Sequence, residues 1–148
     1  FTTIFFGILL YISDKFKLKR NIIKNFTYKS ALFIGFFQIL SLIPGVSRSG
    51  IAITAARLLN FKRVDAGKIS FLLSIPILGA VSIFGIKNLI YSDNISFTYI
   101  NLLSIVTSFF FSLITIKYFL KYISKFNLSI FVFYRIFLGL VLVFFAYL

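Results

Sequence analysis

The sequence contains no cysteine, no histidine and no glutamate, and its only acidic residues are Asp14, Asp65 and Asp93. The absence of cysteine excludes a disulfide framework and a thiolate metal site. Because histidine and glutamate are also missing, general acid–base catalysis has almost no candidate side chains in this chain. The residues present therefore restrict its chemistry severely.

Charged residues are scarce over long stretches of the chain. Hydrophobic residues make up 60% of the sequence, the mean hydropathy is +1.04, and residues 69–86 and 95–116 carry no charge. A helix needs ~20 such residues to cross the hydrocarbon core of a bilayer. The net charge of +13 could indicate nucleic acid, but membrane proteins collect Lys and Arg in cytoplasmic loops. The sequence therefore predicts an all-α, polytopic transmembrane bundle, with membrane lipids and not nucleic acid as its surroundings.

Two basic segments, residues 14–29 and 60–68, flank a mainly apolar region that Pro44 and Gly45 interrupt. The helix expected before this break, residues 30–43, is only ~21 Å long, against ~30 Å for the membrane core. A second short helix is expected over residues 49–59. If both basic segments are cytoplasmic, residues 30–59 form a re-entrant helical hairpin with its tip near mid-depth. The alternative is one kinked span over residues 30–56, which we favour less.

Three full spans are expected after the hairpin, and residues 1–148 are expected to form a single integral membrane domain. Pro76 should kink the first of the three. The segment around Ser92 is nearly neutral and is expected outside the cell, whereas the basic segment 117–125 is expected in the cytoplasm. The chain begins with Phe1 and a short apolar run, which we interpret as the end of an earlier span in a longer protein. The three expected spans are residues 64–90, 95–116 and 128–148.

The expected hairpin tip, PGVSRSG, combines the parts of an anion site. Pro44 ends the first helix, and Gly45 permits a sharp turn and close backbone approach. Either Ser47 or Ser49 can cap the second helix, whose free N–H groups would then lie beside Arg48. A helix N-terminus with an arginine binds anions, and phosphate fits it well. The alternative is that Arg48 pairs with a buried carboxylate and the serines only cap the helix.

Two other arginines lie in or near apolar segments. Arg57 is one turn from the basic segment, so its head group is expected to snorkel toward water. Arg135 lies near the start of the last expected span. It could either reach the cytoplasmic interface or face the bundle, and the sequence leaves both open.

The segments GFFQILSLIPGVSRSG and ISFLLSIPILGA, with the late YR pair, resemble the C-terminal half of the undecaprenyl-diphosphatase (bacitracin-resistance) family. The resemblance implies two inverted repeats, each with a re-entrant hairpin, in a bacterial plasma (inner) membrane enzyme. That enzyme removes phosphate from undecaprenyl diphosphate and recycles the lipid carrier for peptidoglycan. On this basis Arg48, Ser47 and Ser49 are expected to be catalytic, and Gly45 and Gly50 to bind substrate.

The resemblance also implies what this chain lacks. The family's paired glutamates, histidine and further serine belong to the N-terminal half. The divalent cation, Mg²⁺ or Ca²⁺, would rest largely on those acids, so no metal ligand is assigned here. The family pattern places Thr where this chain has Ala52. Thr54 lies two residues on, ~200° around the helix, and would not replace that hydroxyl.

The sequence also bears on two other functions. A polyprenyl-phosphate or other anion transporter could also use a discontinuous helix. However, the arginine that shortly precedes Pro-Gly in one such family is missing here. A phosphatase with a histidine nucleophile is excluded because the chain has no histidine. The expected partner is a polyprenyl diphosphate lipid, and a homo-oligomer is left open.

Overall fold

The computed structural model describes residues 1–15, 20–91 and 99–147, and within these residues it contains helices and no strands. The all-helical class expected from the sequence is confirmed. The elements are α1 Thr2–Asp14, α2 Ile22–Asn25, α3 Tyr28–Ile39, the 3-10 turn η1 Leu40–Leu42, α4 Arg48–Leu58, α5 Arg63–Tyr91, α6 Tyr99–Lys125 and α7 Ser129–Tyr147.

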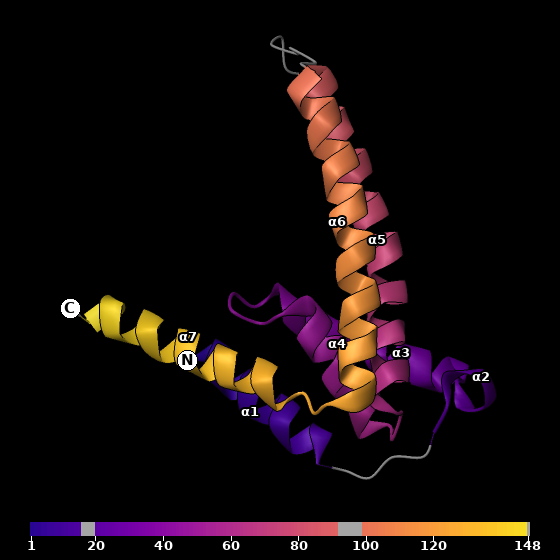
Figure 1. Cartoon of the computed structure of the whole chain (residues 1–148), viewed down its shortest axis with the longest axis vertical. Coiled ribbons are helices and arrows are strands. Elements are labelled where there is room, and N and C mark those ends of the chain that lie inside the picture. Colours follow the sequence, from indigo (N-terminus) through magenta and orange to yellow (C-terminus); the bar gives the residue numbers. More distant parts are fainter. Residues whose placement is uncertain (16–19, 92–98, 148) are drawn as a thin grey trace.

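The helices form a cluster from which one long pair rises. α1, α3, α4 and α7 lie together, and α5 and α6 extend away from them (Figure 1). α4 is the central helix of the cluster because it packs against α1, α3 and α5. Ala52, Ala55 and Ala56 are fully buried on it, and such small side chains let neighbouring helices approach closely. α4 is consequently held by several elements at once.

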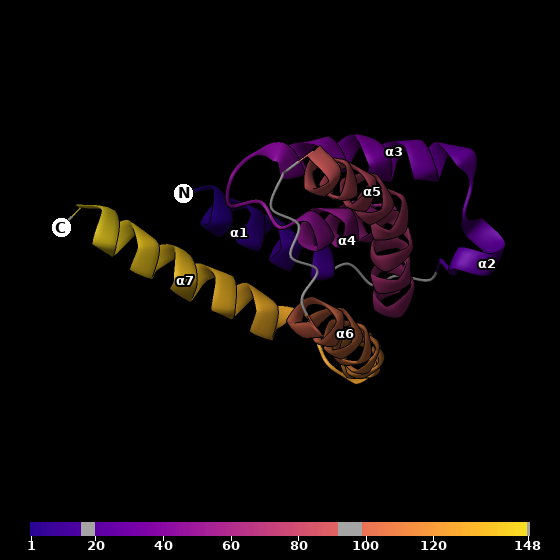
Figure 2. The same ribbon diagram turned by 90° about the horizontal axis from the view of Figure 1, so that it is seen from above.

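α3 and α4 are joined through η1 and the Pro44–Gly45 turn, and they pack against each other (Figure 2). α3 begins two residues earlier than expected because Thr27 caps it, accepting a hydrogen bond from the Ser30 N–H at 3.3 Å. The two basic segments that flank this pair lie side by side. The Arg20 N–H donates to the Asn60 carbonyl and the Lys62 N–H to the Arg20 carbonyl, each at 3.1 Å.

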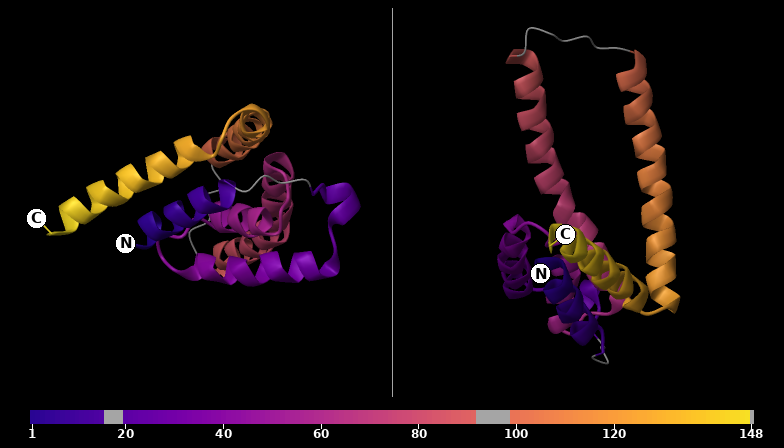
Figure 3. Two further views of the ribbon diagram at one scale, coloured as in Figure 1. Left: turned by 90° about the horizontal axis from the view of Figure 1, so that it is seen from below. Right: turned by 90° about the vertical axis from the view of Figure 1, so that its left-hand side faces the viewer.

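α5 and α6 have the length and composition to cross a membrane, over Arg63–Asn88 and Tyr99–Lys125. They overlap in Figure 1 but are separated along most of their length in Figure 3. α5 continues through Pro76, and its axis bends in the view from above (Figure 2).

The segment 117–125, expected as a basic loop, is instead the last part of α6. The helix can continue because this stretch contains three lysines and a leucine, which favour helix, and no glycine or proline, which would interrupt it. Residues 95–98 and the segment around Ser92 lie outside the described residues, so their expected positions stay predictions.

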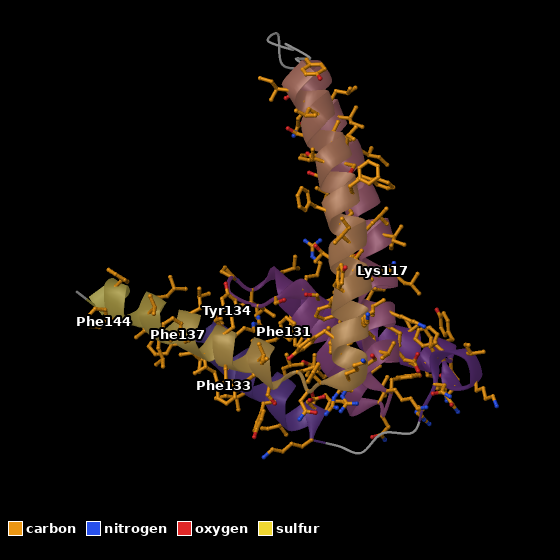
Figure 4. The ribbon with its side chains drawn as sticks, viewed as in Figure 1. Lys117, Phe131, Phe133, Tyr134, Phe137 and Phe144 are labelled. Atoms are coloured by element: carbon orange, nitrogen blue, oxygen red, sulfur yellow. The ribbon has the colours of Figure 1, made fainter. Side chains whose placement is uncertain are left out.

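α7 is shorter, with Ser129–Phe145 as its apolar part, and its aromatic side chains divide into two sets. Phe131 packs against Phe119 of α6, with ring centroids 5.3 Å apart. Phe133, Phe137 and Phe144 point outward from α7 (Figure 4) and are more than half exposed. An outward apolar surface of this kind is typical of contact with lipid or with further protein.

Candidate anion site at the start of α4

The turn that precedes α4 requires glycine at position 45. Gly45 has a φ of 88°, a conformation that side-chain-bearing residues rarely adopt. The turn is also held from α1, because the Thr2 hydroxyl donates to the Pro44 carbonyl at 2.7 Å and the Thr3 hydroxyl to the Gly45 carbonyl at 3.2 Å. A Cβ added to Gly45 would lie 2.5 Å from Thr2 Oγ1. Sequence reasoning missed both threonines because they lie 42 positions from their acceptors.

Ser47, and not Ser49, caps α4. The Ser47 Oγ accepts a hydrogen bond from the Gly50 N–H at 3.1 Å, and its backbone is extended, as an N-cap requires. The Ser49 Oγ lies 3.2 Å from the Ser47 Oγ. The Ser49 carbonyl accepts from the buried Ser70 hydroxyl at 3.3 Å. Both serine hydroxyls are therefore grouped at the positive end of the α4 dipole.

Arg48 is the first residue of α4 and is exposed. It lines a crevice with Gln38 of α3, Ser49, and Ser70 and Ser74 of α5. Within the part of the chain that the structure describes, the ion pairs involve Arg57 and Arg63, and Arg48 is in none of them. The alternative of an Arg48–carboxylate pair is thus not observed there. The guanidinium has its donors available for an anion.

Arg135 faces the bundle, which decides between the two positions left open by the sequence. Its Nη1 lies 2.8 Å from where a Cβ on Gly50 would stand. Arg135 lines a second crevice with Ser47, Ser49 and Gly50. Two guanidinium groups therefore flank the first turn of α4, Arg48 on one side and Arg135 on the other, and Ser49 borders both crevices. Position 50 requires the smallest side chain because the Arg135 head group lies against it.

The expectation that Arg57 snorkels is wrong. Arg57 is only 3% exposed, because its guanidinium is held by acceptors brought from distant parts of the chain. It pairs with the Asp14 carboxylate at 3.0 Å and donates to the Asp14 carbonyl at 2.8 Å and to the Phe61 carbonyl at 3.1 Å. Arg57 therefore stabilises the fold by linking the C-terminal end of α4 to Asp14 of α1, and it is not part of the candidate anion site.

Thr54 and Ala52 are both buried, each 1% exposed. The Thr54 hydroxyl donates to the Gly50 carbonyl at 2.8 Å, within α4 itself. It is therefore engaged by the backbone, in agreement with the expectation that it would not stand in for a hydroxyl at position 52.

The described residues do not fit a resident divalent cation. Among them no three His, Cys, Asp or Glu side chains gather in one place. Asp14 is occupied by Arg57, Arg63 and the Leu128 N–H, and the Asp65 carboxylate accepts from the Ile22 N–H. Hard cations such as Mg²⁺ need several free oxygen ligands. No step of the chemistry is assigned to a metal held by these residues.

Together these features define a class of protein. It is a helical protein with two helices suited to cross a membrane. Its candidate anion site is a capped helix start with an exposed arginine that is in no ion pair among the described residues. The family model for bacitracin resistance protein BacA matches residues 1–141, and the chain belongs to this family.

Relatives of this chain carry the name undecaprenyl-diphosphatase. The protein of that name from Pelagibacter ubique (strain HTCC1062) is 52% identical over 141 residues, which are 95% of this chain and 55% of the relative. The one from Chromohalobacter salexigens is 42% identical over 142 residues, 95% of this chain and 53% of the relative. The one from Elusimicrobium minutum is 40% identical over 141 residues, again 95% of this chain and 52% of the relative. The chain thus spans about half the length of the curated relatives it matches.

Proposed function

We propose that this chain supplies one half of the active site of an undecaprenyl-diphosphate phosphatase, which hydrolyses undecaprenyl diphosphate to undecaprenyl phosphate and phosphate. The observation that carries the proposal is Arg48, exposed and without an ion pair in the described residues, on the first residue of a helix that Ser47 caps. The family and the names of the relatives support this substrate and favour the phosphatase over the transporter.

The role proposed for this half is to hold and neutralise the phosphate groups. In the reaction, water attacks the terminal phosphorus and the bond from that phosphorus to the bridging oxygen breaks. The bridging oxygen leaves as part of undecaprenyl phosphate, and negative charge develops on it and on the terminal phosphoryl oxygens. Arg48, Arg135 and the N–H groups at the start of α4 are placed to stabilise that charge. The hydroxyls of Ser47 and Ser49 would orient the phosphate oxygens.

We infer that the proton of the attacking water goes to a base outside this chain. Histidine and glutamate are absent from the sequence, Asp14 and Asp65 are engaged elsewhere, and Asp93 lies outside the described residues. A divalent cation, if the reaction uses one, would likewise take its ligands from the other half of the longer protein.

In the membrane, we propose that α3, η1 and α4 form the re-entrant hairpin of one inverted repeat in a multi-pass protein of the bacterial plasma membrane. The contact between Arg20 and Asn60–Lys62 supports it, since both ends of the hairpin then lie at one face. α5, α6 and α7 would be the three spans. α5 and α6 meet the length test for a membrane helix.

A split-protein assay tests whether this chain supplies the phosphate-binding residues and the other half supplies the base. The chain alone, reconstituted with a polyprenyl diphosphate, should release no phosphate. Co-expression with the N-terminal half of the Pelagibacter ubique relative should restore release, and Arg48→Ala in this chain should abolish it again. Release by the chain alone would contradict the proposal, because the base would then have to lie among its own residues.

A further inference from the structure

Residues from α1, α2, the end of α4, the start of α5 and α6 line a pocket of about 620 Å³. It includes Arg57, in the last turn of α4, and so lies at the end of that helix opposite the Pro44–Gly45 turn. Its lining carries six cationic side chains and two acidic ones. We call it the basic-end pocket, and its cationic residues are Lys15, Lys24, Arg57, Lys62, Arg63 and Lys68. The volume is within the range of roughly 300–1,000 Å³ that is usual for small-molecule sites.

The acids of this pocket leave the lysines without counter-charges. The Asp14 carboxylate is held by Arg57 and Arg63 at 3.0 and 2.8 Å. Asp65 accepts from the Ile22 N–H at 3.3 Å. Within residues 1–15, 20–91 and 99–147, no lysine has a carboxylate oxygen within 4.0 Å. All four lysines of the pocket are exposed. The Lys15 ammonium lies over the Tyr11 ring, 4.6 Å from its centroid, and those of Lys24, Lys62 and Lys68 are available to an anion.

The clustering of positive side chains in this pocket is not explained by favourable interactions with helix dipoles. A cation is favourable at a helix C-terminus, which suits Lys15 after α1, but it is unfavourable at an N-terminus. Lys62 and Arg63 lie at the N-terminus of α5, and Lys68 is only one turn further on. An anion at this position would be attracted both by the lysines and by the positive end of α5.

The surroundings of the pocket indicate a lipid and not a soluble anion. α2 presents Ile23, 93% exposed, next to Lys24. Exposed apolar residues interleaved with lysines are typical of a segment lying at a membrane surface. The membrane-length helices α5 and α6 both have an end at this pocket, since Arg63, Val64, Asp65 and Lys68 of α5 and Ile123 and Ser124 of α6 line it. Basic groups at such ends attract the anionic lipids of the cytoplasmic leaflet.

We propose that the basic-end pocket binds the phosphodiester headgroup of an anionic phospholipid. The headgroup phosphate lies between Lys24, Lys62 and Lys68 at the start of α5, and Ile23 enters the interface beside it. This site is separate from the anion site at the start of α4 and does not depend on the phosphatase proposal.

The test uses the complete protein that carries this chain, in mixed micelles of phosphatidylcholine with increasing phosphatidylglycerol. Lipid retention is measured by native mass spectrometry and the unfolding midpoint by thermal scans. The pocket variant is Lys24→Gln/Lys62→Gln/Lys68→Gln. The matched control, Lys117→Gln/Lys121→Gln/Lys125→Gln, removes the same charge from α6 residues outside the pocket lining. Lys117 projects from α6 in Figure 4.

The unaltered protein and the control should retain phosphatidylglycerol and unfold at a higher midpoint as its fraction rises. The pocket variant should lose affinity by about fivefold for each lysine removed. Equal losses in both variants, or no loss in either, would overturn the proposal. So would an equal rise in midpoint with inorganic phosphate in phosphatidylcholine alone, which would make this a site for a free anion. If the triple variant unfolds without anionic lipid, the single variant Lys24→Gln, on exposed α2, replaces it. Its retention of phosphatidylglycerol and its unfolding midpoint are then compared with those of the unaltered protein, and no loss of retention would overturn the proposal.

Discussion

Asp14 and Arg57, 43 positions apart, are joined twice, by a 3.0 Å ion pair and by a 2.8 Å hydrogen bond from the guanidinium to the Asp14 carbonyl. The same carboxylate also accepts from Arg63 Nε at 2.8 Å and from the Leu128 N–H at 3.2 Å. One buried side chain thus connects the end of α1 with α4, α5 and the start of α7. Of these elements, α4 carries Arg48 and Ser49 of the candidate anion site, α7 carries Arg135, and α1 holds the turn before α4 through hydrogen bonds to its carbonyls.

Asp14→Asn should lower stability severely. Removing one charge from a buried pair leaves its partner uncompensated and typically costs about 3–5 kcal/mol. The thermal midpoint in detergent, followed by far-ultraviolet circular dichroism, measures the effect. Asp65→Asn is the matched control, because Asp65 accepts only the Ile22 N–H among the contacts described, and its midpoint should fall much less. Equal small shifts would show that the Asp14 pairs are weak.

Arg57→Lys should also be destabilising, by roughly 1–3 kcal/mol, because an ammonium cannot reproduce the fixed fork of a guanidinium. Arg57 bonds the Asp14 carboxylate, the Asp14 carbonyl and the Phe61 carbonyl together. The exposed Lys68→Arg change serves as control. If Arg57→Lys unfolds at the same midpoint as the unaltered protein, position 57 needs only a positive charge and not the geometry of a guanidinium.

Gly45→Ala should distort the turn before α4. Its positive φ costs a side-chain-bearing residue roughly 1–2 kcal/mol, and the added Cβ would collide with the threonine hydroxyls of α1. Gly79→Ala is the matched control, because a Cβ there meets nothing within 4 Å and alanine favours the helix. The two variants should therefore move the unfolding midpoint in opposite directions. Movement in the same direction would contradict the account of the turn.

Thr54→Ala should leave phosphate release by the complete protein within a few-fold of normal. Its hydroxyl is used by the Gly50 carbonyl inside α4, and losing one such hydrogen bond costs about 1 kcal/mol of stability. Steady-state kinetics with a polyprenyl diphosphate give the comparison, with Ser47→Ala as the contrasting variant. A loss of kcat for Thr54→Ala as large as that for Ser47→Ala would place this hydroxyl in the reaction.

The parts of the structure that follow from local chemistry could be predicted from the sequence. Pro44 and Gly45 end one helix, and a serine caps the next, because these effects act within a few residues. The features that could not be predicted depend on contacts between residues that are far apart in the sequence. Arg57 looks like a snorkelling residue until Asp14 is placed beside it, and nothing in the sequence couples Thr2 to Pro44. Arg135 could be placed only after α7 was seen to pass the first turn of α4.

The most direct test of the central claim is phosphate release by the complete protein when Arg48 is replaced by lysine. A guanidinium can hold two phosphate oxygens at once and an ammonium cannot. Loss of a contact made in the transition state costs about 10²–10³ in kcat, by analogy with lost oxyanion donors. Arg48→Lys should therefore fail nearly as badly as Arg48→Ala, while the exposed Arg20→Lys change stays near normal. Near-normal kcat for Arg48→Lys at saturating polyprenyl diphosphate would contradict the assignment of Arg48 as the phosphate clamp.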